Sequence, residues 1–279
     1  LKATAKLMQG KTLDTVYIGG GTPTTLEADQ LDRLLGTIRE NFDLEHVLEF
    51  TVEAGRPDSI TREKLEVIRK YPVTRISVNP QTMQQKTLDL VGRKHTVEDV
   101  EQIFNLAREL GFDNINMDLI AGLPGEDAAD MQDTLEKIEK LHPDSLTVHA
   151  LAIKRAAKFG QEGRTMDPGT EITQMVEAAA ASAERMGLVP YYLYRQKNIA
   201  GNFENVGYAE QDKAGVYNIL IMEEKQAILA CGAGASTKRV WNLPDGYHIE
   251  RCENVKDIKQ YIARIDEMIE RKKALFEKD

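Results

Sequence analysis

YIGGGTPTTL, residues 17–26, is the segment from which the fold can be worked out. The residues that lead into it, 14–18, favour a short strand, and apolar residues recur at helical spacing over residues 26–42. Three glycines between a strand and a helix permit positive φ and let the backbone approach another molecule closely. Amides in such a turn suit a carboxylate, a phosphate or the polar edge of a cofactor. Taken alone, the turn also fits a purely structural connection.

Two familiar phosphate-binding motifs do not fit this turn. No Gly-Lys-Ser/Thr follows it, so it is not a Walker loop. Thr24 stands where the G-x-G-x-x-G motif needs its third glycine. Residues further along the chain must therefore show whether the turn serves a ligand.

Predicted strands and helices alternate after the turn. Strands are predicted at residues 14–18, 47–53, 75–81, 114–120 and 145–150; helices are predicted at residues 26–42, from an N-cap at Thr61, and at residues 96–110, 128–141 and 168–186. This alternation predicts an α/β fold with a parallel sheet, either a barrel or a doubly wound sheet. In both cases ligands bind at the carboxyl ends of the strands.

Polar residues recur at those strand ends. The glycine turn is followed by Glu53, by Asn79 and Gln81, by Asp118 and by His149. Each of them taken singly is explained more simply as a loop cap or a solvated charge. As a set that converges on one edge of a sheet, they favour a ligand site.

The character of the chain changes after Gly187. Residues 191–250 contain a tyrosine cluster, a polar loop and short apolar runs, and we interpret them as an extension of the sheet. Residues 255–278 predict a charged amphipathic helix. The predicted domains are therefore an α/β domain at residues 1–190 and a C-terminal α+β extension at residues 191–279.

Composition excludes several classes of protein. The net charge of −9 argues against nonspecific binding of nucleic acid or of an anionic membrane, and the sequence has no apolar run long enough for a membrane span. Cys231 and Cys252 are too few for a disulfide framework, so a reducing cytoplasm is expected. The five histidines are scattered, which argues against a histidine-built zinc site.

The order of the strand-end segments resembles the radical S-adenosylmethionine superfamily. Within it, the chain is similar to the oxygen-independent coproporphyrinogen III oxidase (HemN-like) family and to its HemZ-type dehydrogenase branch. The resemblance rests on residues 17–24, 51–57, 75–82, 92–96 and 117–125, while residues 191–198 and 230–235 point to the dehydrogenase branch.

The resemblance implies a partial (β/α)6 barrel that holds S-adenosyl-L-methionine across the strand ends. It implies that Gly20, Gly21 and Thr22 receive the amino group of the methionine moiety, and that Arg93 pairs with its carboxylate. It further implies that Glu53, Gln81 and Asp118 hold the ribose and neighbouring polar atoms, with Ile120 and Ala150 on the adenine side. Simpler interpretations remain for two of these residues, Arg93 as a surface cation and Asp118 as a buried cap. The resemblance assigns no catalytic residue.

One departure from the family pattern is large. The cluster loop of the family, C-x-x-x-C-x-x-C, is absent, and Cys231 and Cys252 cannot supply three clustered thiolates. We expect an incomplete radical enzyme that lacks the first strand of the barrel and is cut near Asp279. Such a chain would not hold the [4Fe–4S] cluster or be active alone. A natural cluster-free relative is the alternative.

The resemblance also implies a reaction for the intact protein. The cluster would reduce S-adenosyl-L-methionine, and the resulting 5′-deoxyadenosyl radical would take hydrogen from a propionate of coproporphyrinogen III. Loss of CO2 and an electron would leave a vinyl group. A flavodoxin or ferredoxin is the expected electron donor. Cations that would suit the propionates, or that are ordinary surface charges, are Lys154, Arg155, Lys158, Arg195 and Lys197.

Two rival functions remain open. One is a non-catalytic haem carrier on the same scaffold. The other is a cluster-free barrel that binds an anionic ligand or uses Glu53 and Asp118 for acid–base chemistry, which needs a raised carboxyl pKa. The sequence leaves the oligomeric state open.

Overall fold

The computed structural model describes residues 1–8, 10–151, 168–194 and 205–278. The chain divides into two compact units. Unit 1 comprises Leu1–Val16, Asp32–Leu48 and Val216–Asp279, and unit 2 comprises Tyr17–Leu31 and Glu49–Gly215. All the residues predicted to bind S-adenosyl-L-methionine belong to unit 2. The domain boundary at residue 190 stays a prediction.

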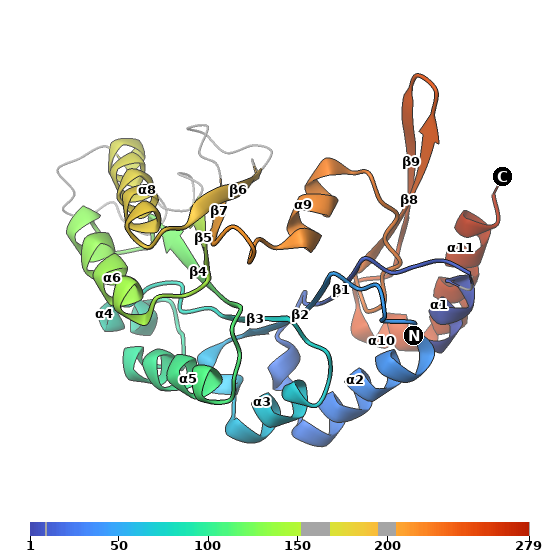
Figure 1. The fold of residues 1–279 in the computed structure, drawn as a ribbon, viewed down its shortest axis with the longest axis horizontal. Coiled ribbons are helices and arrows are strands. Elements are labelled where there is room, and N and C mark those ends of the chain that lie inside the picture. Colours follow the sequence, from blue (N-terminus) through green and yellow to red (C-terminus); the bar gives the residue numbers. More distant parts are fainter. Residues whose placement is uncertain (9, 152–167, 195–204, 279) are drawn as a thin grey trace. The chain divides into compact units, whose positions relative to one another are not determined.

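A seven-stranded sheet with the order β1-β2-β3-β4-β5-β7-β6 organises the fold (Figure 1). Its strands are β1 (Thr15–Ile18), β2 (Glu49–Gly55), β3 (Arg75–Val78), β4 (Ile115–Ala121), β5 (Ser145–Ala150), β6 (Val189–Tyr194) and β7 (Asn205–Ala209). The strands from β2 to β5 are parallel, and β7 is antiparallel to both β5 and β6. This is the mostly parallel, partial-barrel α/β fold that the sequence predicts, with its carboxyl strand ends on one edge.

The two faces of the sheet differ in polarity. Register places Ser77 beside Asn116 and Asp118 beside Thr147, so these polar side chains share one face. The alternate residues share the other face, and they form the buried apolar core: Val52, Ile76, Met117, Leu119, Leu146 and Val148. One face of the sheet thus carries polar side chains that suit a polar ligand, and the other carries apolar side chains that suit packing by helices.

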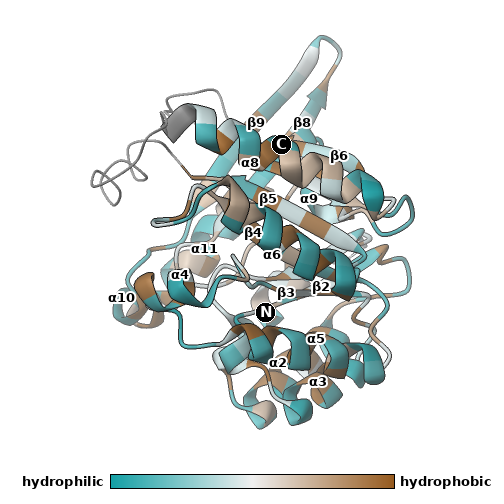
Figure 2. Cartoon of the chain, turned by 90° about the vertical axis from the view of Figure 1, so that its left-hand side faces the viewer, coloured by the Kyte–Doolittle hydropathy of each residue, from teal (hydrophilic) through white to brown (hydrophobic). Residues whose placement is uncertain are grey.

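Helices cover the apolar face. They are α3 (Arg62–Arg69), α4 (Gln85–Leu90), α5 (Val97–Glu109), α6 (Ala128–Leu141) and α8 (Pro168–Arg185). Hydrophobic and hydrophilic residues alternate around α6, which buries Met131, Leu135 and Ile138 (Figure 2). Both α5 and α6 begin at a capping box, which satisfies two backbone groups at each helix start. Among the described residues, every helix is too short or too polar to cross a bilayer.

The remaining elements are two short 3-10 turns of unit 2, a helix shared by both units, and the elements of unit 1. They are η1 (Pro23–Thr25), η2 (Pro57–Ser59), α2 (Ala28–Asn41), α1 (Lys2–Leu7), α9 (Val216–Glu223), β8 (Ser236–Leu243), β9 (Gly246–Glu253), α10 (Ile258–Ala263) and α11 (Ile265–Phe276). Strands β8 and β9 form a two-stranded hairpin, which Figure 1 shows as a long ribbon. Within unit 1, α11 packs against this hairpin and against α1.

The C-terminal prediction holds only in part. Strands β6 and β7 do extend the sheet, but α9 is a helix and β8–β9 form a sheet of their own. The single helix predicted at residues 255–278 is two helices, because Arg264 leaves the helical conformation at φ −114° and ψ 27°. The short helix α4 has no counterpart among the predicted elements.

Candidate functional site

The glycine turn presents open backbone at the end of β1. Gly20 has φ +84°, and neither Gly20 nor Gly21 has a neighbouring atom within 4 Å of the position that a Cβ would occupy. Gly19 is different, because a Cβ there would collide with the Glu53 carboxylate and the Tyr17 ring. Gly19 is therefore required for packing, while Gly20 and Gly21 leave room for another molecule.

Thr24 fixes the turn from beneath. Its hydroxyl, which is fully buried, donates to the Ala54 carbonyl at 2.6 Å and lies 2.7 Å from the Ser59 hydroxyl. Thr22 is extended, and its carbonyl accepts from the backbone and the hydroxyl of Thr25. The residue that excludes the G-x-G-x-x-G motif thus anchors this turn to the end of β2.

Glu53 lies at the end of β2, next to the turn. Its Oε2 accepts from the Gly20 amide at 3.3 Å, and its carboxylate also accepts from Tyr17. Burial raises the pKa of Glu53, and the nearby Asp118 raises it further, against the lowering effect of these hydrogen bonds. The two carboxyl groups therefore lie closely enough to interact across the strand ends.

A hydrogen-bonded chain on the polar face orients Asp118. Asn116 donates to Asp118 Oδ1 at 2.7 Å, and Thr147 donates to Asn116 at 3.1 Å. His149 Nε2 lies 4.0 Å from Asp118 Oδ2. Tyr192 forms a hydrogen bond with Thr147, and burial raises the pKa of its phenol. Asp118 is thus held through Oδ1 by Asn116 of the same strand, and its Oδ2 lies toward His149.

Gln81 occupies the point where the chain leaves β3. It has φ +71°, which costs about 1–2 kcal/mol for a residue with a Cβ. Its amide donates to the Asp118 carbonyl and its carbonyl accepts from the Ile120 amide, both at 2.9 Å. Within the described part of the chain, its side-chain amide forms no hydrogen bond, so it is available to a ligand.

Arg93 is a half-buried cation without an anionic partner among the described residues. Burial lowers the pKa of its guanidinium, and the neighbouring Arg56 lowers it further, while Asp58 opposes both. Asp58 is already occupied, because Arg56 binds it through two hydrogen bonds of 3.1 and 2.7 Å. A guanidinium that is partly desolvated and unpaired is suited to binding a carboxylate.

Ile120 and Ala150 differ in their surroundings. Ile120 pairs with His149 in the sheet and is half-buried on the face that carries Asp118. The side chain of Ala150 instead belongs to an apolar cluster with Ile172 of α8, and its amide donates to Asn205. The structure therefore brings Ile120 to the polar face, whereas Ala150 packs with the helix layer.

Other predicted groups lie elsewhere or outside the described residues. The five cations proposed for propionates, Lys154, Arg155, Lys158, Arg195 and Lys197, are outside the described ranges. In the part of the chain that the structure describes, no three His, Cys, Asp or Glu residues come together as a metal site. Cys231 and Cys252 are free thiols and belong to unit 1.

Sequence reasoning missed the residues that support the site. Tyr17, Asn116, Thr147 and Tyr192 all bond to predicted ligand residues or to their supports. For Asn116 and Thr147 a signal existed, because each lies two residues from a strand-end residue or beside one in register, on the same face. Tyr192 joins the site through an antiparallel strand, whose pairing local sequence does not reveal.

The sequence of this chain is similar to those of known proteins. The sequence profile of the Radical SAM superfamily matches residues 1–138. The oxygen-independent coproporphyrinogen-III oxidase-like protein HemZ of Bacillus subtilis is 46% identical over 276 residues, which cover 95% of this chain and 54% of HemZ. The heme chaperone HemW of the same organism is 31% identical over 264 residues, which cover 91% of this chain and 63% of HemW.

A solved structure shares the fold. The Escherichia coli coproporphyrinogen III oxidase HemN, described as a radical SAM enzyme, aligns with a TM-score of 0.70 and 22% identity. The alignment covers 96% of this chain and 62% of HemN. This chain therefore spans between 54% and 63% of the length of these three proteins.

Proposed function

The chain belongs to the radical SAM superfamily, and we propose that unit 2 binds S-adenosyl-L-methionine at the carboxyl ends of its strands. The observation that carries this proposal is the unpaired, half-buried guanidinium of Arg93, on the same unit as an open glycine turn and three polar strand-end side chains. In radical SAM proteins the bound cofactor supplies a 5′-deoxyadenosyl radical for hydrogen abstraction.

The residues present fit this cofactor in charge and in hydrogen-bonding capacity. Arg93 offers a planar fork to the methionine carboxylate. The carbonyl groups of the open turn at Gly20 and Gly21, with the Thr22 hydroxyl, offer acceptors to the ammonium group. Glu53 and Asp118 offer carboxylate acceptors for ribose hydroxyls, and Gln81 offers both a donor and an acceptor. The contacts described above hold the glycine turn, Glu53, Asp118 and the backbone of Gln81, so this part of the site is preformed.

The residues present do not fit a [4Fe–4S] cluster. The whole sequence has two cysteines, and a cluster of this type needs three clustered thiolates in this family pattern. No step is therefore assigned to a cluster on this chain. We propose that a cluster, where the intact protein uses one, is ligated by residues outside this sequence.

We propose that the substrate of the intact protein is a porphyrinogen. The support is the 46% identity to a protein named coproporphyrinogen-III oxidase-like. The reaction would be oxidative decarboxylation of propionates to vinyl groups in haem biosynthesis, in the cytoplasm, with a flavodoxin or ferredoxin as electron donor.

Ala150 would contribute backbone to the adenine side of the cofactor site, since its side chain packs with Ile172.

Haem carriage is the second candidate. The observation that favours it is the 31% identity to a heme chaperone over 91% of this chain. A carrier would use the same barrel without releasing decarboxylated product. A cluster-free ligand-binding barrel is the third candidate, and the raised pKa of Glu53 would suit acid–base chemistry there.

Anaerobic reconstitution of the full-length protein with iron and sulfide separates these functions. With S-adenosyl-L-methionine, a reductant and coproporphyrinogen III, we expect 5′-deoxyadenosine and decarboxylated porphyrinogen in the products. Stable haem binding without turnover would replace the enzyme with the carrier. Failure of the full-length protein to take up iron would favour the cluster-free barrel.

A further inference from the structure

Gln81 is held in an unfavourable backbone conformation. Among the described residues, only Gln81, His142 and Glu224 combine a side chain with positive φ. His142 does so as the C-cap of α6, where this conformation is common. A residue with a side chain keeps a positive φ only where contacts with the surrounding structure hold it there. The contacts on both sides of Gln81 therefore decide where its side chain lies.

On one side, Gln81 is bound to β4. Its amide donates to Asp118 and its carbonyl accepts from Ile120, so Gln81 forms an isolated parallel bridge with Leu119. These bonds place Gln81 beside two residues that belong to the proposed cofactor site. They constrain the backbone on the N-terminal side of the next residue, Thr82.

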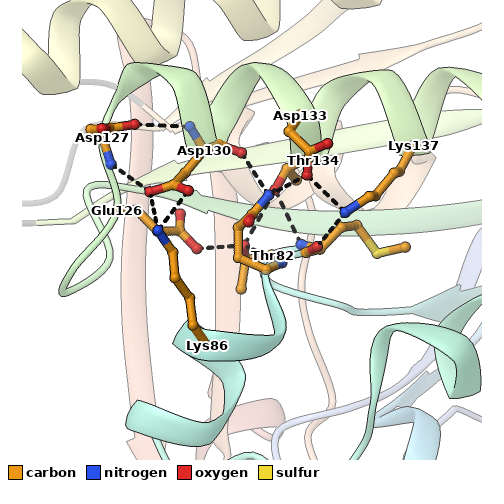
Figure 3. Close-up of polar contacts among 10 residues, drawn as sticks. Thr82, Lys86, Glu126, Asp127, Asp130, Asp133, Thr134 and Lys137 are labelled. Atoms are coloured by element: carbon orange, nitrogen blue, oxygen red, sulfur yellow. Dashed lines mark hydrogen bonds and ion pairs between the residues drawn. The ribbon is translucent and has the colours of Figure 1, made fainter.

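On the other side, the chain enters a buried polar cluster of Thr82, Glu126 and Thr134, here called the Thr82 cluster (Figure 3). Each of the three residues is at most 2% exposed. The Thr82 hydroxyl donates to Glu126 Oε1 at 2.5 Å, and the Thr134 hydroxyl accepts from the Met83 amide at 3.2 Å. The Thr82 hydroxyl also accepts from the Gln84 amide at 3.2 Å.

A ring of more exposed contacts surrounds the Thr82 cluster. Lys137 of α6 donates to the Met83 carbonyl at 3.1 Å, and Lys86 pairs with Asp130 at 2.7 Å. Gln84 donates to the Asp130 carbonyl. Exposed pairs contribute little, so the buried hydroxyl–carboxylate bond is the main constraint on this segment.

The Thr82 cluster buries a carboxyl group, and the desolvation of this group costs free energy that a contact made only to pack α6 would not require. Burial raises the pKa of Glu126, against the lowering effect of its bond from Thr82. A buried carboxyl group is tolerated when it is hydrogen-bonded, and apolar residues of similar volume would pack there without that requirement. The hydrogen bond from Thr82 to Glu126 is directional, and Thr82 directly follows the strained Gln81. This bond therefore restrains the backbone conformation at Gln81 as well as the packing of Thr82.

We propose that Thr82 and Glu126 are positioning residues, which hold the side chain of Gln81 toward the cofactor and set its affinity without touching it. This inference rests on the proposed function, because it takes Gln81 as a ligand contact. In this proposal the buried pair of Thr82 and Glu126 affects cofactor binding through the neighbouring Gln81.

A double-mutant cycle on this chain tests the proposal, with S-adenosyl-L-methionine as the calorimetric probe. We expect Thr82→Val, which keeps the shape and removes the hydroxyl, to weaken binding about fivefold, the equivalent of one hydrogen bond. Thr82→Ser and Glu126→Gln keep a donor and an acceptor, so they should retain affinity within about twofold. In the Gln81→Ala background, Thr82→Val should cause no further loss, because its effect passes through Gln81.

The outcomes separate this inference from the proposed function. Additive losses in Thr82→Val and Gln81→Ala would overturn the positioning role, as would an affinity loss in Ile138→Val, a core variant of α6, at equal loss of thermal stability. If Arg93→Ala weakens binding while Gln81→Ala does not, the cofactor site stands and the positioning role fails. If neither variant matters, the proposed function itself fails.

A second readout needs no ligand. The Ile120 amide donates to the Gln81 carbonyl, so it reports directly on the position of Gln81. We expect Thr82→Val to accelerate hydrogen exchange of the Ile120 amide by about tenfold or more, while exchange in α5 stays unchanged. Unchanged protection of Ile120 in a folded Thr82→Val variant would contradict the proposal.

Discussion

Glu53 combines a structural cost with a proposed binding role. Its carboxyl group is desolvated and lies close enough to Asp118 for the two to interact unfavourably. A group whose pKa is raised by folding stabilises the protein below its ordinary value of 4.5 and loses that contribution as the pH rises through the raised pKa. At neutral pH the ionised Glu53 therefore destabilises the fold.

Glu53→Gln should stabilise the chain at pH 7 by on the order of 1 kcal/mol, because the amide oxygen can still accept from Gly20 and the side chain carries no charge. The gain should shrink as the pH is lowered toward 4.5. Denaturant unfolding at several pH values measures this, with the exposed Glu45→Gln as the control. A stability gain that does not depend on pH would show that the charge of Glu53 is not its source.

Arg93 is the residue that we propose recognises the methionine carboxylate. Arg93→Ala should weaken binding of S-adenosyl-L-methionine about 10- to 100-fold, the usual range for a lost hydrogen bond to a charged group. Arg93→Lys should give an intermediate affinity, because an ammonium keeps the charge and loses the fork. The matched control is Arg62→Ala, whose side chain pairs with Glu109 in the same unit. Calorimetry showing equal affinity for wild type and Arg93→Ala would remove Arg93 from the site.

Among the elements, the turn between β4 and α6 depends on two glycines with different surroundings. Gly122 has φ +89°, and a Cβ there would lie 2.9 Å from the buried side chain of Ile172. Gly125 has φ +78°, and its Cβ would meet Leu90 at an ordinary 3.5 Å. The first position is restricted by conformation and by space, and the second only by conformation.

Gly125→Ala should therefore cost about 1–2 kcal/mol from backbone strain, and Gly122→Ala about 1–3 kcal/mol more from overpacking. Chemical denaturation of both variants measures the difference. Equal destabilisation would mean that Ile172 moves aside freely. Loss of stability in Gly125→Ala alone would contradict the packing of α8 against β4.

The sequence predicts the elements of the sheet better than their supports. The five predicted strands and their helices follow from apolar periodicity and from signals such as Thr61, which caps its helix in the structure as predicted. The parallel topology predicts that Glu53 and Asp118 lie near one another, although Asp118 lies within β4 and not at its end. Glu53, Gln81 and Asp118 can therefore be chosen by their place in the strand order, whereas Arg93 and Ile120 come from the family resemblance.

Features that depend on nonlocal pairing could not be predicted. The packing of Ala150 with Ile172 depends on which face of β5 meets α8, and the strain at Gln81 depends on its bridge to Leu119. The break at Arg264 interrupts a helical pattern that continues on both sides of it. For Ala150 and Gln81, tertiary contacts decide a detail that local propensity leaves open.

For the molecule as a whole, we propose that unit 2 alone binds the cofactor. The proposed ligand residues lie within Tyr17–Leu31 and Glu49–Gly215, on one polar sheet face and the turns that follow it. The two cysteines belong to the other unit. A site at the carboxyl ends of the strands is consistent with membership of the radical SAM superfamily and with the HemN-like fold.

An amide chemical-shift titration of the ¹⁵N-labelled chain with S-adenosyl-L-methionine tests whether unit 2 alone binds the cofactor. We expect saturable shifts that cluster at Gly20, Gly21 and Thr22, at Gln81, and from Asp118 to Ile120. We expect no comparable cluster in Val216–Asp279. Shifts confined to that segment, or the absence of saturable shifts at the glycine turn and at Gln81, would contradict the assignment.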